Sequence, residues 1–231
     1  MSTAKSARMT DGAAGAESRT DWWARYKHAL RYSLYVITHP FDGFWDLIHE
    51  KRGSVAAANF FVILLLAARL MELQHTSFLF LSVYWPKVNI FEQCISLLLP
   101  LGIYCLCNWG LTTLFDGKGT LRDVYIATAY ALVPYILSQL ANIPLSNWLT
   151  RDEGSFYTVL TSVGIIWSSM LLVCSMIQVH DYSLGKTLLF LFMTAIGMVI
   201  VVFLLLLFLT LVGDGIGYFV SMYKEINFRL N

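Results

Sequence analysis

The amino-acid sequence predicts an all-α integral membrane protein, a five-span helical bundle preceded by N-terminal interfacial amphipathic helices. Residues 187–213 carry no charge and are mostly Leu, Phe, Ile and Val, a run longer than the ~20 residues that a helix needs to cross a bilayer. Of the 231 residues, 57% are hydrophobic and 13% are charged, and the mean hydropathy is +0.62. A soluble domain of this composition would expose more apolar surface than such domains tolerate.

The N-terminal region contains no apolar run long enough to span a membrane. Residues 1–18 are rich in Ala, Gly, Ser and Thr, a composition that predicts a disordered cytoplasmic tail. In residues 19–53, aromatic and aliphatic residues alternate with Arg and Lys at helical spacing, which predicts cytoplasmic juxtamembrane amphipathic helices interrupted at Pro40. The first of these helices is equally compatible with the lipid headgroup layer and with packing on the protein's own cytoplasmic face.

Residues 54–213 are predicted to form the five-span membrane domain, and residues 214–231 an extracytoplasmic amphipathic tail. Ser54 is the predicted N-cap of the first span, and Thr120 with Asp123 fits the capping-box pattern before the third. The five predicted spans are Val55–Leu73, Ile95–Phe115, Val124–Asn142, Phe156–Val179 and Thr187–Gly213.

Lys and Arg residues are divided unevenly between the two ends of these spans. Eleven lie before the first span or in the turns around Lys118 and Lys186, and four lie in the other loops and the C-terminal tail. Because cytoplasmic loops are enriched in Lys and Arg, the N-terminus is predicted inside the cell. Five spans then place the C-terminus outside.

The residue patterns of common enzymes are missing from the sequence. The five histidines form no H-E-x-x-H metalloprotease motif, and no G-x-S-x-G motif is present. The glycine-rich turn at residues 115–120 has Thr112 where a phosphate-binding loop needs its first glycine. The formal net charge of +1 gives no electrostatic footprint for nucleic acid. We therefore expect no catalytic residue, no metal site, no cofactor and no nucleic-acid partner.

Polar residues inside the spans are informative because lipid offers them no hydrogen-bond partner. Two stripes at helical spacing, one on the third span and one on the fourth, are predicted to meet and form polar contacts within the bundle. A solute pathway is the alternative, which the lack of a formal charge in either stripe disfavours. The predicted contact residues are Thr128, Tyr135, Gln139 and Asn142 on the third span, and Ser168 and Ser175, with Thr161 and Gly164, on the fourth.

Arg69 and Glu72 are the charged residues that fall inside a predicted span. They lie three residues apart near its outer end, so the two side chains are expected to pair on one helix face and to extend outward to the interface. Because a coupled transporter usually needs a charge near the membrane midplane, this position favours a structural role.

Short motifs occur in a characteristic order after Pro40, and they are Pro40–Phe44, Glu50–Ser54, Asn108–Trp109, Thr112–Leu114, Asp116–Thr120, Tyr130–Tyr135, Tyr182–Ser183 and Tyr223–Glu225. With them the sequence resembles the bacterial branch of the Yip (Ypt-interacting protein) domain family. The resemblance implies five spans, a cytoplasmic N-terminus and no enzymatic activity. Eukaryotic relatives bind small prenylated GTPases, but the D-L-Y-G-P signature of those members is replaced here by residues 41–45, which read F-D-G-F-W.

Bacterial relatives are often encoded beside carbohydrate ABC importers, so the resemblance implies an accessory subunit in the bacterial cytoplasmic membrane. The expected function is a non-catalytic scaffold that sits in the lipid bilayer and packs against another integral membrane protein, such as the permease of an ABC importer. A small-solute transporter or channel is the alternative. The residues expected to contact the partner are Trp85, Asn108, Trp109, Asp116 and Lys118.

Overall fold

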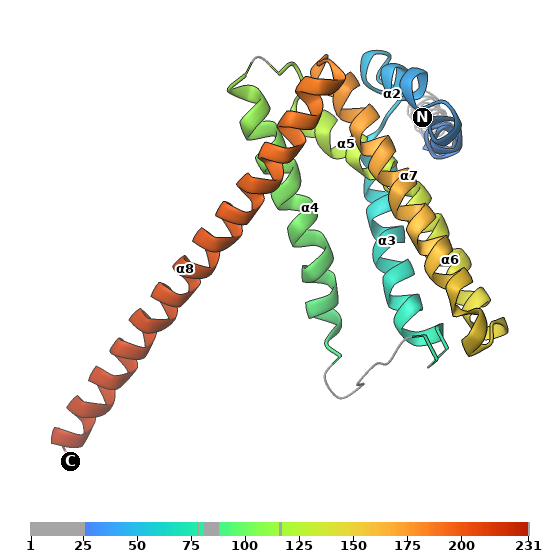
Figure 1. Ribbon diagram of the computed structural model, residues 1–231. Coiled ribbons are helices and arrows are strands. Elements are labelled where there is room, and N and C mark those ends of the chain that lie inside the picture. Colours follow the sequence, from blue (N-terminus) through green and yellow to red (C-terminus); the bar gives the residue numbers. More distant parts are fainter. Residues whose placement is uncertain (1–25, 78, 81–87, 116, 231) are drawn as a thin grey trace, which may run out of the picture.

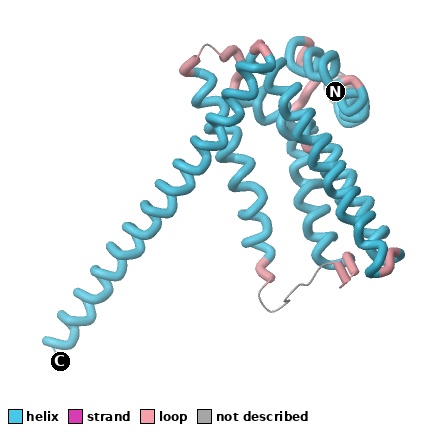
Figure 2. The backbone as a smooth tube through the Cα atoms, in the orientation of Figure 1, coloured by secondary structure: helices cyan, strands magenta, loops and turns pink. Residues whose placement is uncertain are grey.

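The computed structural model describes residues 26–77, 79–80, 88–115 and 117–230. Every regular element in these ranges is a helix, as the fold-class prediction states (Figures 1 and 2). Residues 26–38 form a helix, which is followed by α2 (Pro40–His49), α3 (Val55–His75), α4 (Ile90–Thr113), α5 (Leu121–Ala131), α6 (Val133–Trp148), the 3₁₀ turn η2 (Arg151–Glu153), α7 (Gly154–His180) and α8 (Leu184–Leu230).

Within the described residues, five segments are long and apolar enough to cross a membrane: α3, α4, α5 with α6, α7 and α8. The turn between α4 and α5 and the turn between α7 and α8 lie at one end of the molecule, beside α2 (Figure 1). The α6–α7 connection lies at the opposite end, as does the lower end of α3. This alternation of ends agrees with five passes through one bilayer.

The helix of residues 26–38 and α2 together cap one end of the bundle. Pro40 occupies the first turn of α2, where its missing N–H removes no helical hydrogen bond. Ala29, Tyr32 and Val36 form the buried face of the first helix, and the hydroxyl of Tyr130 in α5 donates to the carbonyl of Ala29 at 3.0 Å. One face of this helix therefore packs on the protein itself.

The helix starts follow the side chains that the sequence offers as caps. The Ser54 hydroxyl accepts from the N–H of Ala57 at 3.1 Å, which confirms Ser54 as the N-cap of α3. The predicted capping box before α5 is confirmed, since the Thr120 hydroxyl accepts from the Asp123 N–H and the Asp123 carboxylate accepts from the Thr120 N–H. These bonds satisfy backbone donors that a helix start leaves free.

The predicted continuous third span is in fact two helices, α5 and α6, joined at Leu132. Pro134 explains the break, because proline has no N–H to donate and its ring clashes with the carbonyl four residues earlier. The two helices together still form one candidate crossing from Leu121 to Trp148. This segment is the centre of the bundle, with 61% of its most apolar stretch buried.

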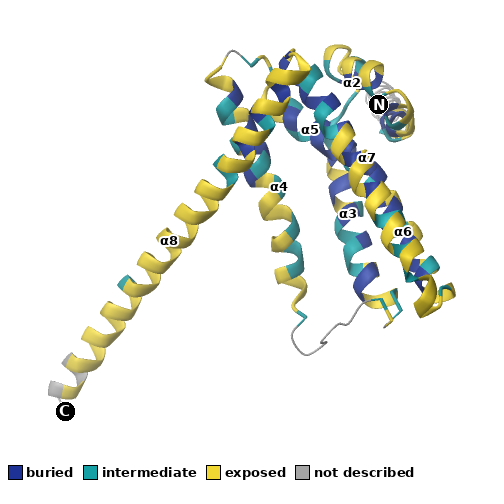
Figure 3. Ribbon diagram, viewed as in Figure 1, coloured by how far each residue is buried: buried dark blue, intermediate teal, exposed yellow. Residues whose placement is uncertain are grey.

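α3, α5, α6 and α7 form the packed core of the molecule, and α4 with α8 forms a second pair beside it. Figure 3 shows the buried residues concentrated in the first group and α8 exposed along most of its length. α8 leaves the bundle after a short contact with α4 and extends away from the other helices (Figure 1). None of its most apolar stretch is buried.

α8 extends beyond the end of the predicted fifth span. Residues 214–230, which the sequence assigns to an amphipathic tail, continue the same helix as far as Leu230. The chain contains no proline after Pro144, and the glycines at 213, 215 and 217 cost a helix about 1 kcal/mol each without removing a hydrogen bond. Nothing in the local sequence therefore ends the helix where the apolar run ends.

Candidate functional site

The break between α5 and α6 creates a polar contact to α7. The Tyr135 N–H donates to the hydroxyl oxygen of Ser168 at 3.0 Å. In an unbroken helix this N–H would bond to the carbonyl of Ala131, four residues earlier. Ser168 therefore replaces a backbone acceptor that the break removes, and its side chain fixes α7 against the bend.

α6 and α7 approach closely just below this contact. A Cβ atom on Gly164 would lie 2.0 Å from the Ser138 hydroxyl oxygen and 2.6 Å from its Cβ. The glycine therefore permits a helix separation that any larger residue would prevent. Ser138 itself is buried, and its hydroxyl donates back to the Tyr135 carbonyl at 2.8 Å.

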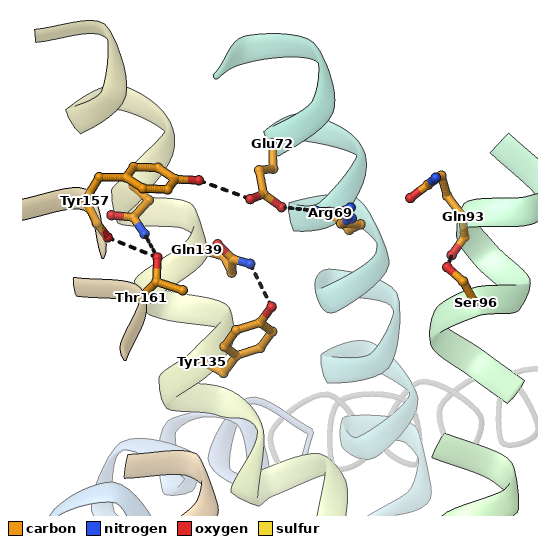
Figure 4. A network of polar contacts seen from close by, with 9 residues as sticks. Arg69, Glu72, Gln93, Ser96, Tyr135, Gln139, Tyr157 and Thr161 are labelled. Atoms are coloured by element: carbon orange, nitrogen blue, oxygen red, sulfur yellow. Dashed lines mark hydrogen bonds and ion pairs between the residues drawn. The ribbon is translucent and has the colours of Figure 1, made fainter. Parts of the chain in front are cut away.

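About one and two turns after Tyr135, α6 carries two buried amide side chains, Gln139 and Asn142, and Figure 4 shows Gln139 directed toward Tyr135. The Asn142 amide nitrogen donates to the Thr161 hydroxyl at 2.7 Å, and the Gln139 amide nitrogen donates to the Tyr135 hydroxyl at 2.7 Å. Among the described residues, however, the carbonyl oxygens Oε1 of Gln139 and Oδ1 of Asn142 have no partner. Two buried acceptors thus remain available close to one another on the same helix face.

An ion pair lies in the same half of the bundle. The Arg69 guanidinium is 2.7 Å from a carboxylate oxygen of Glu72 on α3, which confirms the expected pairing. Glu72 does not extend outward as expected, because it is 5% exposed and its second oxygen accepts from the Tyr157 hydroxyl of α7 at 3.2 Å. Figure 4 shows Glu72 between Arg69 and Tyr157. The carboxylate therefore links α3 to α7 inside the protein.

Thr128 and Ser175 complete the two predicted stripes, and both are buried. The hydroxyl of Thr128 donates to the Val124 carbonyl, and that of Ser175 to the Leu172 carbonyl. Each of these two hydrogen bonds lies within its own helix, and both residues are covered by neighbouring helices. The interhelical polar contacts are concentrated at Tyr135, Ser168, Asn142 and Thr161 instead.

A second polar cluster lies where α4, α7 and α8 meet. The Asn108 amide oxygen accepts from the His180 ring nitrogen Nε2 at 3.0 Å, and the Asn108 amide nitrogen donates to the Thr194 hydroxyl at 3.4 Å. Asn108 is 1% exposed. Its predicted place on a partner-facing surface is therefore wrong, because three helices enclose it.

His180 and Thr194 are polar residues of this cluster that the sequence reasoning missed. Both lie at or within apolar spans, where a polar group needs an internal partner, and that rule is the signal that could have found them. Their partner Asn108 is 72 residues from His180 and 86 from Thr194 along the chain. Helical periodicity on one span cannot reveal such a contact.

Trp109 and Lys118 are the other predicted partner residues in the described part of the chain. Trp109 is 39% exposed, on the α4 face that also exposes Leu106. Lys118 is exposed and pairs with Asp181 at 2.8 Å, joining the α4–α5 turn to the α7–α8 turn. This hydrogen bond lowers the pKa of the Asp181 carboxyl and raises that of the Lys118 ammonium. Trp85 and Asp116 lie outside the described residues.

No group of three or more His, Cys, Asp or Glu side chains in the described ranges is arranged to hold a metal ion. The cysteines at 94, 105, 107 and 174 are all free thiols. The chemistry that the described site residues offer is thus hydrogen bonding and one buried ion pair between helices.

No curated protein sequence and no solved structure matches the chain. A family model for the Yip1 domain matches residues 34–208, from the N-terminal capping helices to the middle of α8. This match covers well over half of the 231 residues. It includes both polar clusters and all five candidate membrane helices at least in part. The chain is therefore a member of the Yip1 domain family and a multi-pass membrane protein.

Proposed function

We propose that this protein is a non-catalytic membrane scaffold that packs against another integral membrane protein through α8 and the neighbouring face of α4. The observation that carries the proposal is the exposure of α8, an apolar helix of 47 residues whose most apolar stretch has no buried residue. Its buried residues include Phe190 and Thr194, and its contact with α4 continues to Gly197, where a Cβ would lie 3.5 Å from Leu111. Beyond Gly197 the helix offers Leu, Phe and Val side chains outward.

The length of α8 strengthens this reading. At roughly 1.5 Å per residue it extends about 70 Å, against a hydrocarbon layer of about 30 Å. To remain inside the membrane over much of its length, α8 would have to tilt strongly. Helix tilt is determined by packing against neighbouring helices, and the described part of this chain supplies such a neighbour only near the start of α8. A partner helix would supply the remaining contacts.

The partner class follows from the resemblance to the bacterial branch of the family, which indicates a permease of a carbohydrate ABC importer in the bacterial cytoplasmic membrane. The proposed contact surface also includes the aromatic outer loop at Trp85 and the turn that contains Asp116 and Lys118. Trp109 extends this surface along α4, where its ring is partly exposed. Asn108 is not part of it.

Photo-crosslinking in the native membrane tests the proposal. A photoreactive phenylalanine analogue at Phe208, which is 61% exposed, should capture one integral membrane protein that mass spectrometry identifies. The same analogue at Phe44, which is fully buried, should capture none. Replacing Trp85, Trp109 or Asp116 with Ala should reduce the captured amount, since truncating a central interface aromatic costs ~2 kcal/mol or more. Trp148→Ala is the matched control, because Trp148 is an exposed tryptophan at the C-terminal end of α6 and is not part of the proposed surface. Lipid adducts alone at Phe208 would contradict the scaffold.

A small-solute transporter is the second candidate, and the orphan acceptors of Gln139 and Asn142 favour it. Buried polar atoms without partners are uncommon in membrane bundles, and a pathway for a polar solute would use them. Reconstitution separates the two candidates. The purified chain alone in liposomes should move neither sugar nor ion if it is a scaffold, whereas flux that Gln139→Leu abolishes would establish the transporter.

A further inference from the structure

The helix of residues 26–38, α2 and the following Arg52 line an open surface cavity of about 520 Å³ at the end of the bundle. Arg31, Arg52 and His28 form its polar wall, and Leu34 and Tyr35 form its apolar wall. A second cavity of about 460 Å³ adjoins it, shares His28 and Arg52, and adds Lys51. Basic groups and apolar groups therefore line the same space, with Arg31, Leu34 and Tyr35 on one helix and Asp46 of α2 also at the wall.

Fixed contacts hold Arg52 at the cavity wall. Its guanidinium pairs with Glu50 at 2.5 Å and with Asp46 at 3.5 Å, and lies 5.8 Å from the centre of the Tyr32 ring. The Tyr32 hydroxyl in turn lies 3.2 Å from both Asp46 and the Gly43 carbonyl, and can donate to either. Tyr32 is 7% exposed, so this wall is part of the packed structure.

Arg31 differs from Arg52 because no carboxylate in the described part of the chain pairs with it. Its side chain is exposed on the cavity side of the first helix. Counting Arg31, Lys51 and Arg52 against Asp46 and Glu50 gives three positive and two negative charges, a net +1 with His28 neutral. A phosphodiester carries one negative charge, which this balance would neutralise.

The apolar wall identifies the kind of phosphate. Leu34 is 58% exposed and Tyr35 41%, and on the adjacent α2 Phe41 and Trp45 are 52% and 47% exposed. Exposed aromatic and aliphatic side chains beside cations are typical of helices at the membrane interface. A soluble phosphate would gain nothing from this wall, whereas the glycerol and first acyl carbons of a lipid would cover it.

We propose that this cavity binds the headgroup of an anionic glycerophospholipid, with Arg31 and Arg52 on the phosphate and Leu34 and Tyr35 against the lipid's apolar part. The proposal is independent of the scaffold function, since it concerns the capping helices and not α8. It assigns to the amphipathic N-terminal segment a defined lipid site in place of a diffuse attraction to the membrane surface.

Native mass spectrometry of the full chain in detergent micelles tests the proposal. Delipidated protein is titrated with phosphatidylglycerol and, separately, with phosphatidylcholine, and bound lipids are counted. Phosphatidylglycerol should bind more tightly, and Arg31→Gln should weaken its binding about fivefold, the loss expected for one cation near an anionic lipid. Lys27→Gln is the matched control, because Lys27 is exposed on the same helix but lines neither cavity.

Each other outcome contradicts the site. Equal losses from Arg31→Gln and Lys27→Gln would show general surface attraction. Equal binding of the two lipids would exclude recognition of the anionic headgroup. Competition by soluble glycerol phosphate at the affinity of the lipid would show a free-phosphate site. A second variant, Leu34→Glu, changes an exposed position with little risk to folding and should also weaken phosphatidylglycerol binding, because it places a carboxylate on the apolar wall.

Discussion

Gly164 determines how closely α6 and α7 can pack. Replacing it with Ala would force a Cβ within 2.6 Å of the Ser138 Cβ, so the helices must separate. We expect a destabilisation of about 1–3 kcal/mol, as for other overpacked sites, measured by unfolding in a detergent series. Gly102→Ala is the control, since a Cβ there meets no atom within 4 Å. The double change Ser138→Gly with Gly164→Ala should recover part of the loss, and no recovery would contradict the close contact.

Arg69 and Glu72 provide a second prediction at the residue scale. Arg69→Met leaves the Glu72 carboxylate, 5% exposed, with Tyr157 as its remaining described partner. A buried charged group that loses its partner costs about 1–3 kcal/mol or more, so this variant should unfold at lower denaturant concentration than the native chain. Glu72→Gln should cost less, because the amide oxygen still accepts from Tyr157.

The double variant Arg69→Met with Glu72→Gln distinguishes pairing from separate effects. It should be more stable than Arg69→Met alone, because no charge then remains buried. Additive losses would show that the two side chains do not interact in the membrane.

Hydrogen bonds between neighbouring residues were predictable from the sequence, whereas those between distant residues were not. The caps at Ser54 and Thr120 are predictable because their hydrogen bonds reach three residues along the chain. The burial of Asn108 and Glu72 is not, because it depends on His180, Thr194 and Tyr157, which lie 72 to 86 residues away. A polar residue in a span indicates that a partner is present, but the identity of that partner depends on the fold.

At the scale of elements, the packing of α6 on α7 depends on the bend at Leu132. The sequence predicts that two polar stripes meet, and the structure joins them through Tyr135–Ser168 and Asn142–Thr161. The sequence did not predict the break between α5 and α6, although Pro134 is its signal. Proline is tolerated in membrane helices where neighbours satisfy the freed backbone groups, so its presence alone does not separate a kink from a break.

Cysteine crosslinking tests this helix contact. In a chain whose four native cysteines are replaced by Ser, the pair Asn142→Cys with Thr161→Cys should crosslink in membranes, because the native side chains lie 2.7 Å apart. The pair Leu137→Cys with Ile166→Cys is the control, since both residues are exposed on the outer faces of their helices. Efficient crosslinking of the control pair and none of the Asn142 pair would overturn the arrangement of α6 and α7.

For the whole molecule, the number of crossings follows from composition, because five apolar segments must each leave water. The arrangement of those segments does not follow from composition. α3, α5, α6 and α7 form a compact bundle, while α8 contains the most apolar stretch of the five candidate spans and yet is the least buried. In lipid, apolarity places a helix in the membrane but does not decide whether it packs on the same chain, because lipid tails and Leu side chains are equally apolar.

The orientation of the five spans in the membrane is the last prediction. Basic residues gather before α3 and in the turns at Lys118 and Lys186, and in the described part of the chain α2 and these two turns lie at one end of the bundle (Figure 1). By the positive-inside rule that end is cytoplasmic. A phosphatase reporter, active only outside the cytoplasm, should therefore be active when fused after Asn231 and inactive when fused at Lys118. Because α8 is one continuous helix, a fusion at Gly213 should report the same side of the membrane as a fusion after Asn231. Activity at Lys118 with none after Asn231 would show that the protein has the opposite orientation. Equal activity of the two fusions would place both positions on the same side of the membrane and contradict the five-span topology.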